Sequence, residues 1–330
     1  MVDERTAQSD ARGLVTEIYR TIDRGKTDSL FSLVADPVIV FGPRRGDAMT
    51  TRSDALVALG GVVDTKGNRG KVKRAQLRSG GLGVVVSPGG HSAWAFDVIS
   101  LEGHQLAVTA VLANTDDLWA VTAAALAETP SGRQVKAESA RDAIVPPGAA
   151  AAAKVAPGAG AAVDKLKKGL LDQQTWGDEL ASRDDAIVAG PIAGEVARGK
   201  KAIQRLWTAR MKSNVREATS GELTAAITAD GQLVWISVPV TRVADGEDPM
   251  PLRVFAIYEK AGAGWTLCAL HEALAVDEPG SGTAFKKILP PVPEPPKPPP
   301  ATATEAKPAD TAAAKPAKKK PKKKPKPVAN

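Results

Sequence analysis

The sequence contains a single cysteine and three histidines among its 330 residues. One cysteine excludes an intrachain disulfide framework, and so few cysteine and histidine side chains exclude a zinc site of the Cys/His type within one chain. Glycine-rich phosphate loops, nucleophile elbows and metal-ligand spacings are also absent from the sequence. We therefore predict neither a metal nor a cofactor.

Long hydrophobic runs and a signal peptide are missing as well. No window of the sequence approaches the ~18 uncharged apolar residues that a membrane-spanning helix needs. The first ten residues, MVDERTAQSD, are acidic and polar where a signal peptide has a basic region and then an apolar run. These absences predict a soluble cytoplasmic protein.

Excess positive charge is missing from most of the chain. The formal net charge is +7, but residues 286–330 hold 12 lysines against 3 acidic residues, which leaves 32 basic against 34 acidic residues in 1–285. The same C-terminal segment has 13 of the 25 prolines and no aromatic residue. Because such a segment buries too little apolar surface to fold, we predict a disordered Pro/Lys-rich tail and a slightly acidic body with no overall attraction to phosphate.

What the body does contain is an internal repeat. A linker rich in alanine, proline and glycine, which we place at 129–162, separates two stretches of similar length, 8–128 and 163–276. Four matches between the stretches recur in one order. They are Gly42-Pro43 with Gly190-Pro191 (148 residues apart), Ala55 with Ala202 (147), Trp94 with Trp235 (141) and Trp119 with Trp265 (146). The repeat predicts two copies of one domain.

Both stretches show helical spacing first and short β-branched runs later. In the first stretch we expect helices over 8–24, 28–34 and from residue 53, and strands over 38–41, 82–86, 93–101, 105–113 and 119–126. In the second stretch we expect helices over 163–181 and 200–212, and strands over 185–189, 222–228, 232–241, 251–260 and 264–275. This order predicts an α+β protein in which helices cover one face of a curved antiparallel sheet in each half.

Three segments of the second stretch carry a family resemblance: IVAGP (187–191), GEVARGKKAI (194–203) and LRVFAIYEKAGAGWTLCALH (252–271). With them the chain resembles the SnoaL-like branch of the nuclear transport factor 2-like superfamily, whose members share a cone-shaped fold with ketosteroid isomerases. Arg253, Trp265 and His271 match the family's layout of a strand with Arg, a turn, and a Trp-started strand with a His six residues later. The first stretch keeps Trp119 but has alanines where Arg253 and His271 would lie, so it resembles the family more weakly.

The resemblance implies two cone-shaped domains in tandem. Domains of this family often pair through the outer faces of their sheets, so two copies on one chain imply an intrachain pseudo-dimer. The ketosteroid reaction, as the resemblance implies it, needs a carboxylate base just after the first strand. Gly42 and Gly190 occupy those positions, and Tyr19 lies one residue beyond the position of the family's tyrosine, which turns a helical side chain by about 100°. We therefore do not expect that reaction in either half.

The second stretch supplies the candidate site residues. His271 is the candidate catalytic base, and Arg253, Trp235, Trp265 and Tyr258 are the candidate ligand-pocket residues. Structural alternatives stay open, since the histidine can be a hydrogen-bonded core residue, the arginine can face solvent, and the tryptophans can anchor the core.

Three further side chains have plainer interpretations. Cys268 lies among apolar neighbours and is interpreted as a buried, inert thiol. Glu195 and Asp97 are single carboxylates, which are usually solvated.

The tail carries seven lysines close together: Lys318, Lys319, Lys320, Lys322, Lys323, Lys324 and Lys326. They favour sequence-independent binding to a polyanion, either nucleic acid or an anionic surface, because the tail has no aromatic for base stacking and no arginine for base edges. A tether that binds nothing is the alternative.

Three functions remain open at this point. The first is a small-molecule-binding or catalytically degenerate protein that takes a small hydrophobic ligand mainly in the second domain. The second is an isomerase or cyclase that uses His271 as its base. The third is a scaffold whose lysine-rich tail binds polyanions.

Overall fold

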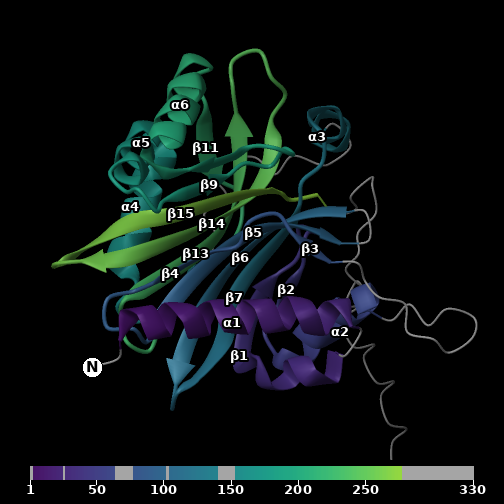
Figure 1. The fold of residues 1–330 in the computed structure, drawn as a ribbon. Coiled ribbons are helices and arrows are strands. Elements are labelled where there is room, and N and C mark those ends of the chain that lie inside the picture. The colour runs from purple at the N-terminus through teal and green to yellow at the C-terminus, as the bar shows by residue number, and fades with distance from the viewer. Residues whose placement is uncertain (1–2, 25–26, 64–76, 102–103, 140–152, 277–330) are drawn as a thin grey trace, which may run out of the picture. The chain divides into compact units, whose positions relative to one another are not determined.

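The computed structural model describes residues 3–24, 27–63, 77–101, 104–139 and 153–276. The chain divides into two units, Met1–Leu289 and Pro290–Asn330. The second unit, and with it the predicted tail, lies outside the described residues. The first unit is α+β, as predicted, with two sheets and helices (Figure 1).

The first half builds one sheet. Its elements are α1 (Glu4–Asp23), the 3-10 helix η1 (Thr27–Ser32), β1 (Val34–Phe41), β2 (Ala48–Met49), α2 (Arg52–Val63), β3 (Arg78–Ser79), β4 (Gly83–Val86), β5 (Ser92–Leu101), β6 (His104–Thr115) and β7 (Leu118–Glu128). The strand order is β2-β1-β7-β6-β5-β3, with β4 also paired to β5. All predicted elements of this half are present within a few residues of their expected bounds.

The second half builds the other sheet. Its elements are α3 (Gly132–Ser139), β8 (Ala153–Val155), α4 (Gly160–Leu171), α5 (Gln173–Ala181), β9 (Ile187–Ala189), β10 (Val196–Arg198), α6 (Gly199–Lys212), β11 (Arg216–Thr219), β12 (Leu223–Ile227), β13 (Leu233–Val243), β14 (Met250–Ala261) and β15 (Gly264–Leu274). The strand order is β10-β9-β15-β14-β13-β12-β8, with β11 also paired to β13.

Three local predictions need correction. The helix expected over 163–181 is two helices, because Asp172 leaves helical geometry and its carboxylate caps α5 by accepting from the Gln174 amide at 3.2 Å. The segment 129–162, predicted as a linker from composition, holds α3 and β8 and the start of α4. The sheets are not purely antiparallel, since β1 pairs with β7, β9 with β15 and β8 with β12 in parallel.

The strand register repeats between the halves. In the first sheet Val98 pairs with Ala107, and in the second Pro239 pairs with Arg253. Val98 and Pro239 are separated along the chain by the same number of residues as Trp94 of β5 and Trp235 of β13. Ala107 and Arg253 are separated by the same number of residues as Trp119 of β7 and Trp265 of β15. The residue separations found in the sequence repeat are therefore also the separations between equivalent strand pairs of the two sheets.

A β-bulge repeats as well. The register shifts between Val111 and Leu112 in the first sheet and, at the equivalent position, between Ile257 and Tyr258 in the second. The residue left unpaired on the partner strand is Thr122 in the first sheet and Cys268 in the second. The Thr122 hydroxyl donates to the Val111 carbonyl at 3.2 Å, and the Cys268 thiol donates to the Ile257 carbonyl at 3.1 Å. Two different side chains thus stabilise the same bulge in the same way.

Each sheet has helices on one face. In the first half, α1 buries Ala7, Ala11, Leu14 and Val15, a spacing that places them on one side of the helix, against residues of the sheet (Figure 1). In the second half, α4, α5 and α6 cover the sheet and contribute to its main apolar core. Within the described ranges, no helix combines the length and the apolar character that crossing a membrane requires.

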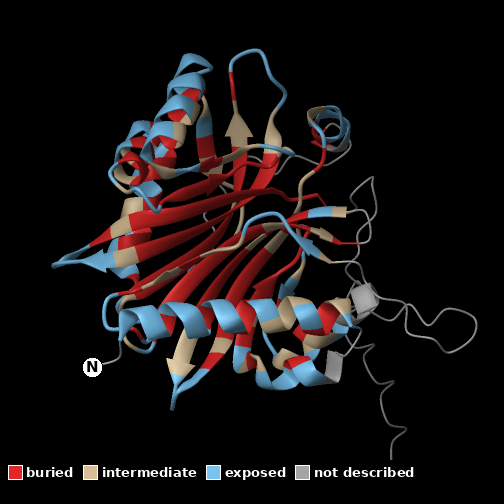
Figure 2. Cartoon of the chain, viewed as in Figure 1, coloured by how far each residue is buried: buried red, intermediate tan, exposed pale blue. Residues whose placement is uncertain are grey.

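The opposite faces of the two sheets share one apolar cluster. Its aromatic centre joins Phe41 of β1 to Trp235 and Phe255, with ring centroids 6.1 Å apart in both pairs, and Trp235 stacks on Phe255 at 5.9 Å. Around these residues the strands are buried on both faces, whereas the helices keep one exposed side (Figure 2). The two halves therefore share a core that neither half completes by itself.

Candidate functional site

A network of four charged side chains lies inside the second half, with Arg210, Glu217 and Glu272 buried and Arg242 slightly exposed. Arg210 of α6 donates from Nη1 to Oε1 of Glu272 on β15 at 2.7 Å, and its Nη2 pairs with the other carboxylate oxygen. Arg242 of β13 lies 2.6 Å from Glu272 through its Nη2 and donates from Nε to Oε1 of Glu217 on β11 at 2.8 Å. Two guanidinium groups thus alternate with two carboxylates across three strands and one helix.

Strand alternation places the network on the helix-covered face. On β15, Leu270 and Leu274 belong to the core under the helices, so Glu272 between them points the same way. On β13 the residues at alternate positions from Val234 to Val240 belong to that core, and Arg242 continues their series. Arg210 extends from α6 beside the Trp207 ring, with its guanidinium carbon 4.8 Å from the ring centroid.

Burial and pairing act in opposite directions on these groups. Burial alone would raise the pKa of Glu272, but the guanidinium groups of Arg210 and Arg242 outweigh it and lower that pKa to about 2. For Glu217 burial is the stronger effect, and its pKa is raised despite the neighbouring Arg242. Burial also raises the pKa of the half-buried Glu195, although the positive charges of Arg210 and Arg242 act in the opposite direction.

One oxygen of the network has no hydrogen-bond partner. Oε2 of Glu217 is enclosed, and no donor among the described residues reaches it. A buried carboxylate oxygen without a donor costs free energy, so it marks a position where a donor group from elsewhere would be favourable. Glu195 on the approach to β10 was predicted to be solvated; it is half-buried instead and lies near the charges of this network.

The first half has apolar side chains at the equivalent positions. The repeat of the ladders places Leu101 where Arg242 lies and Leu126 where Glu272 lies. Extending the β3–β5 register by one residue places Leu77 where Glu217 lies. These three leucines pack in or against one apolar cluster. The same interior is thus charged in one half and apolar in the other.

The first half keeps a smaller polar group of its own. Asp97 is fully buried, contrary to the prediction that it is solvated, because Ser79 Oγ donates to it at 2.6 Å and the Gly81 amide at 2.9 Å. Burial, and then the charge of Asp97, raise the pKa of Tyr19. Asp97 therefore fixes the loop that follows β3 to the sheet.

The sequence-predicted catalytic base, His271, lies on the other face of the sheet. Its Nδ1 is 2.9 Å from Oγ1 of Thr109 in the first half, and the ring meets Phe96 edge-on at 6.3 Å between centroids. Burial lowers the pKa of His271 to about 4. The side chain is therefore buried between the two sheets and joins them.

Arg253 was predicted to line the ligand pocket and also lies between the sheets. Its Nη1 donates to the carbonyl of Gly42 at 2.8 Å, and its Nη2 donates to Arg44 O at 3.2 Å and to Arg45 O. The guanidinium stands over the Phe41 ring, 5.3 Å from its centroid. Arg253 thus binds the turn after β1 of the first half.

The remaining predicted pocket residues are divided by the second sheet. Trp235 lies in the cluster between the sheets, whereas Tyr258 and Trp265 lie in the core under the helices. His271, Arg253 and Trp235 therefore share one face, and Tyr258 and Trp265 share the other. The five residues do not line one cavity, because neighbouring positions on a strand point to opposite faces.

The two glycines after the first strand of each half have a common environment. Gly42 N donates to Asp47 O at 3.2 Å, and Gly190 N donates to Glu195 O at 2.7 Å. A side chain at either glycine would collide with the carboxylate five residues later. Both positions after the first strand of each half are thus closed to a larger side chain.

Two further expectations concern cysteine and metal. Cys268 is fully buried, as predicted, and burial raises its thiol pKa. The described side chains include no group of three or more histidine, cysteine, aspartate or glutamate residues arranged to bind a metal ion. The seven tail lysines lie outside the described residues.

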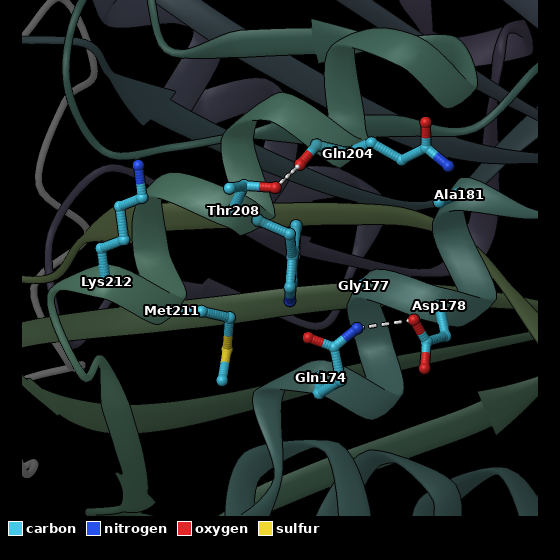
Figure 3. Close-up of a pocket in the computed structure, with 9 residues that line it drawn as sticks. Gln174, Gly177, Asp178, Ala181, Gln204, Thr208, Met211 and Lys212 are labelled. Carbon is cyan, nitrogen blue, oxygen red and sulfur yellow. Dashed lines mark hydrogen bonds between the residues drawn. The ribbon is translucent and has the colours of Figure 1, made fainter.

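A groove opens between α5 and α6 on the outer side of the helices (Figure 3). It measures about 720 Å³ and is lined by Gln174, Gly177, Asp178, Ala181, Gln204, Trp207, Thr208, Met211 and Lys212. Trp207 is buried and donates from Nε1 to the Gln173 carbonyl at 2.5 Å, while Gly177 leaves the space that the indole ring occupies. Gln174 donates to Asp178 at 2.6 Å along one rim.

Comparison with known proteins gives likenesses to solved structures only. No family model and no curated protein matches the sequence. The chain is similar to a cystatin-like fold protein from Burkholderia xenovorans (11% identity, TM-score 0.30, 37% of this chain and 92% of that one). It is also similar to NTF2-like proteins of unknown function from Shewanella baltica (9%, 0.31, 40% and 100%) and Silicibacter pomeroyi (11%, 0.31, 38% and 99%). At these TM-scores the likenesses carry no inference about this chain.

We predict that breaking the network costs more stability than removing it. Glu272→Leu leaves the buried Arg210 without its carboxylate partner and Arg242 paired with Glu217 alone, at a cost of about 3–5 kcal/mol in the free energy of unfolding. Replacing Arg210, Glu217, Arg242 and Glu272 together with leucine leaves the net charge unchanged and is expected to be neutral or stabilising. Urea unfolding measures both, with Glu222→Leu, in the exposed pair with Lys154, as a control within about 1 kcal/mol. A fourfold variant less stable than Glu272→Leu would contradict the prediction.

We also predict an acid-labile contact at His271. The folded protein holds this imidazole neutral down to a pKa of about 4, against 6.5 in an unfolded chain. Between these values the unfolded chain binds the additional proton, so the free energy of unfolding falls as the pH falls, by up to about 3 kcal/mol. His271→Gln should remove this part of the dependence of the free energy of unfolding on pH between pH 6.5 and 4. His91→Gln, at an exposed position, should leave that dependence unchanged. Equal slopes in all three proteins would refute the assignment.

Proposed function

We propose that the chain is a small-molecule-binding protein made of two SnoaL-like, NTF2-like domains, 8–128 and 163–276, and that only the second binds ligand. The observation that carries the proposal is the contrast between the two interiors. Leu101 and Leu126 fill the first, whereas Arg242 and Glu272 stand at the same register positions in the second. Apolar side chains in this interior would cost less free energy of burial than charged ones. A ligand-binding role would account for the charged side chains of the second half.

The first domain acts in this proposal as a structural partner. Its sheet packs on the second sheet, and β7 approaches its own counterpart β15, as equivalent elements do across a two-fold axis. Arg253 binding to the turn after β1, and Thr109 binding to His271, add polar contacts across the same junction. These contacts support the proposed intrachain pseudo-dimer.

The charges of the network favour a ligand with a cationic or donor-rich end. Three carboxylates, Glu195, Glu217 and Glu272, face two guanidinium groups, Arg210 and Arg242. The excess is one negative charge when all are ionised. The oxygen that lacks a donor belongs to Glu217. An ammonium group supplies both the missing hydrogen bond and the missing charge, and the apolar core around the network would hold an aliphatic chain.

The geometry supports binding over catalysis. The base position of the ketosteroid reaction is closed by Asp47 and Glu195 behind the two glycines. His271, the alternative base, is enclosed between the sheets and bound to Thr109. No observation favours the isomerase alternative.

The proposal is tested with a series of aliphatic primary amines. In thermal unfolding of the full chain, amines from propylamine to hexylamine should raise the melting temperature, by about 5 °C or more at a hundred times the dissociation constant. The carboxylic acids of the same length serve as probes of reversed charge and should leave it unchanged. The fourfold leucine variant, which keeps the net charge and the apolar core, should lose the response to amines.

Two results would contradict the proposal. One is an amine response that survives in the fourfold variant, which would place binding elsewhere. The other is the absence of any response in the native protein, together with a mass spectrum of the purified chain that shows no co-purified small molecule.

A further inference from the structure

One helix of the body concentrates positive charge. Residues 199–216 contain six basic residues and no acidic one, although 1–285 as a whole is slightly acidic. Two of the six face partners, since Arg210 is buried against Glu272 and Arg216 lies 3.9 Å from Asp245. The other four lie on α6 and are exposed: Lys200, Lys201, Arg205 and Lys212. The near balance of the body's charges therefore conceals a basic face, which composition alone could not reveal.

The four exposed cations of α6 are not neutralised locally. In the part of the chain that the structure describes, none of them forms an ion pair with a carboxylate. Asp178, the acidic residue across the Figure 3 groove from Lys212, accepts a hydrogen bond from Gln174 on its own helix. The positive potential of this face is therefore available to an external anion.

The cations and polar donors form a stripe along the helix axis. Lys201, Arg205, Thr208 and Lys212 follow a spacing of four, three and four residues, which places them on one side of α6 over about 16 Å. Lys201, Gln204, Arg205 and Thr208 also line a shallow hollow of about 450 Å³. The stripe therefore offers several N–H and O–H donors in a row.

The exposed face of α6 does not suit a membrane surface. Its large apolar residues Ile203 and Trp207 are buried against the rest of the second half, and Met211 is its one exposed large apolar residue. A helix that lies in a lipid interface needs a broad apolar face free to enter the bilayer. A linear polyanion with regularly spaced phosphates needs only the charged stripe.

We propose that the outer face of α6 binds the phosphate backbone of a nucleic acid, without base recognition. The stripe has no exposed aromatic side chain for base stacking, so contact with phosphates is the chemistry that it supports. This surface differs from the buried network and from the tail, and it stands or falls independently of the proposed ligand site.

The test measures binding of the full chain to a fluorescent 20-nucleotide oligo-dT by anisotropy. Lys200, Lys201, Arg205 and Lys212 are changed together to glutamine, which removes charge from exposed positions that make no ion pair. The matched control changes four other exposed cations, Arg5, Arg78, Arg133 and Lys136, to glutamine. The tail is present and identical in all three proteins, so its contribution cancels.

The α6 variant should bind at least tenfold more weakly at 100 mM salt, and the slope of log affinity against log salt should become less negative by roughly 2–3. The control variant should stay within about twofold of the native protein. Equal losses in the two variants would mean that only overall charge matters and would overturn the proposal. So would no measurable binding by the native chain, or a loss on vesicles of phosphatidylcholine and phosphatidylserine in equal parts that exceeds the loss on oligo-dT.

Discussion

The structure depends on the apolar contact between the two sheets. Phe41, Trp235 and Phe255 form its aromatic centre, and each half leaves these side chains on the face that its own helices do not cover. A sheet with one exposed apolar face needs a partner, and the other half of the chain supplies one in the same molecule. Arg253 and His271 are buried at this junction, where the Arg253 guanidinium and Nδ1 of His271 bind groups of the first half.

The two halves share a strand register but differ in their interiors. The ladder register and the bulges at Thr122 and Cys268 are common to both halves, so the two halves have equivalent backbone frameworks. The residues that point toward the helices differ, with leucines in the first half and an ion network in the second. A framework held by backbone hydrogen bonds tolerates such a change when the whole set of interior side chains changes together.

Sequence reasoning was sufficient for the elements and insufficient for the site. Periodicity predicted the long helices and strands, because apolar spacing is set by the side of each element that is buried, but it missed α3 and the short strands β2, β3, β8, β10 and β11. Which residues form the site depends on the face of the sheet to which each side chain points. His271 and Glu272 are adjacent on β15 and therefore point to opposite faces. The family resemblance directed attention to His271. Glu272, flanked by Leu270, Ala273 and Leu274, carried the better signal, since a carboxylate in so apolar a strand must be paired.

Hydrogen exchange measured by mass spectrometry tests the shared core most directly. Amides of β6 (His104–Thr115) and β14 (Met250–Ala261) lie in the interior of the first and second sheets. If the halves depend on one junction, both sets should exchange through the same global opening, with equal protection and equal sensitivity to denaturant. Exchange of one sheet at lower denaturant, while the other stays protected, would show that the halves fold independently and would contradict the account.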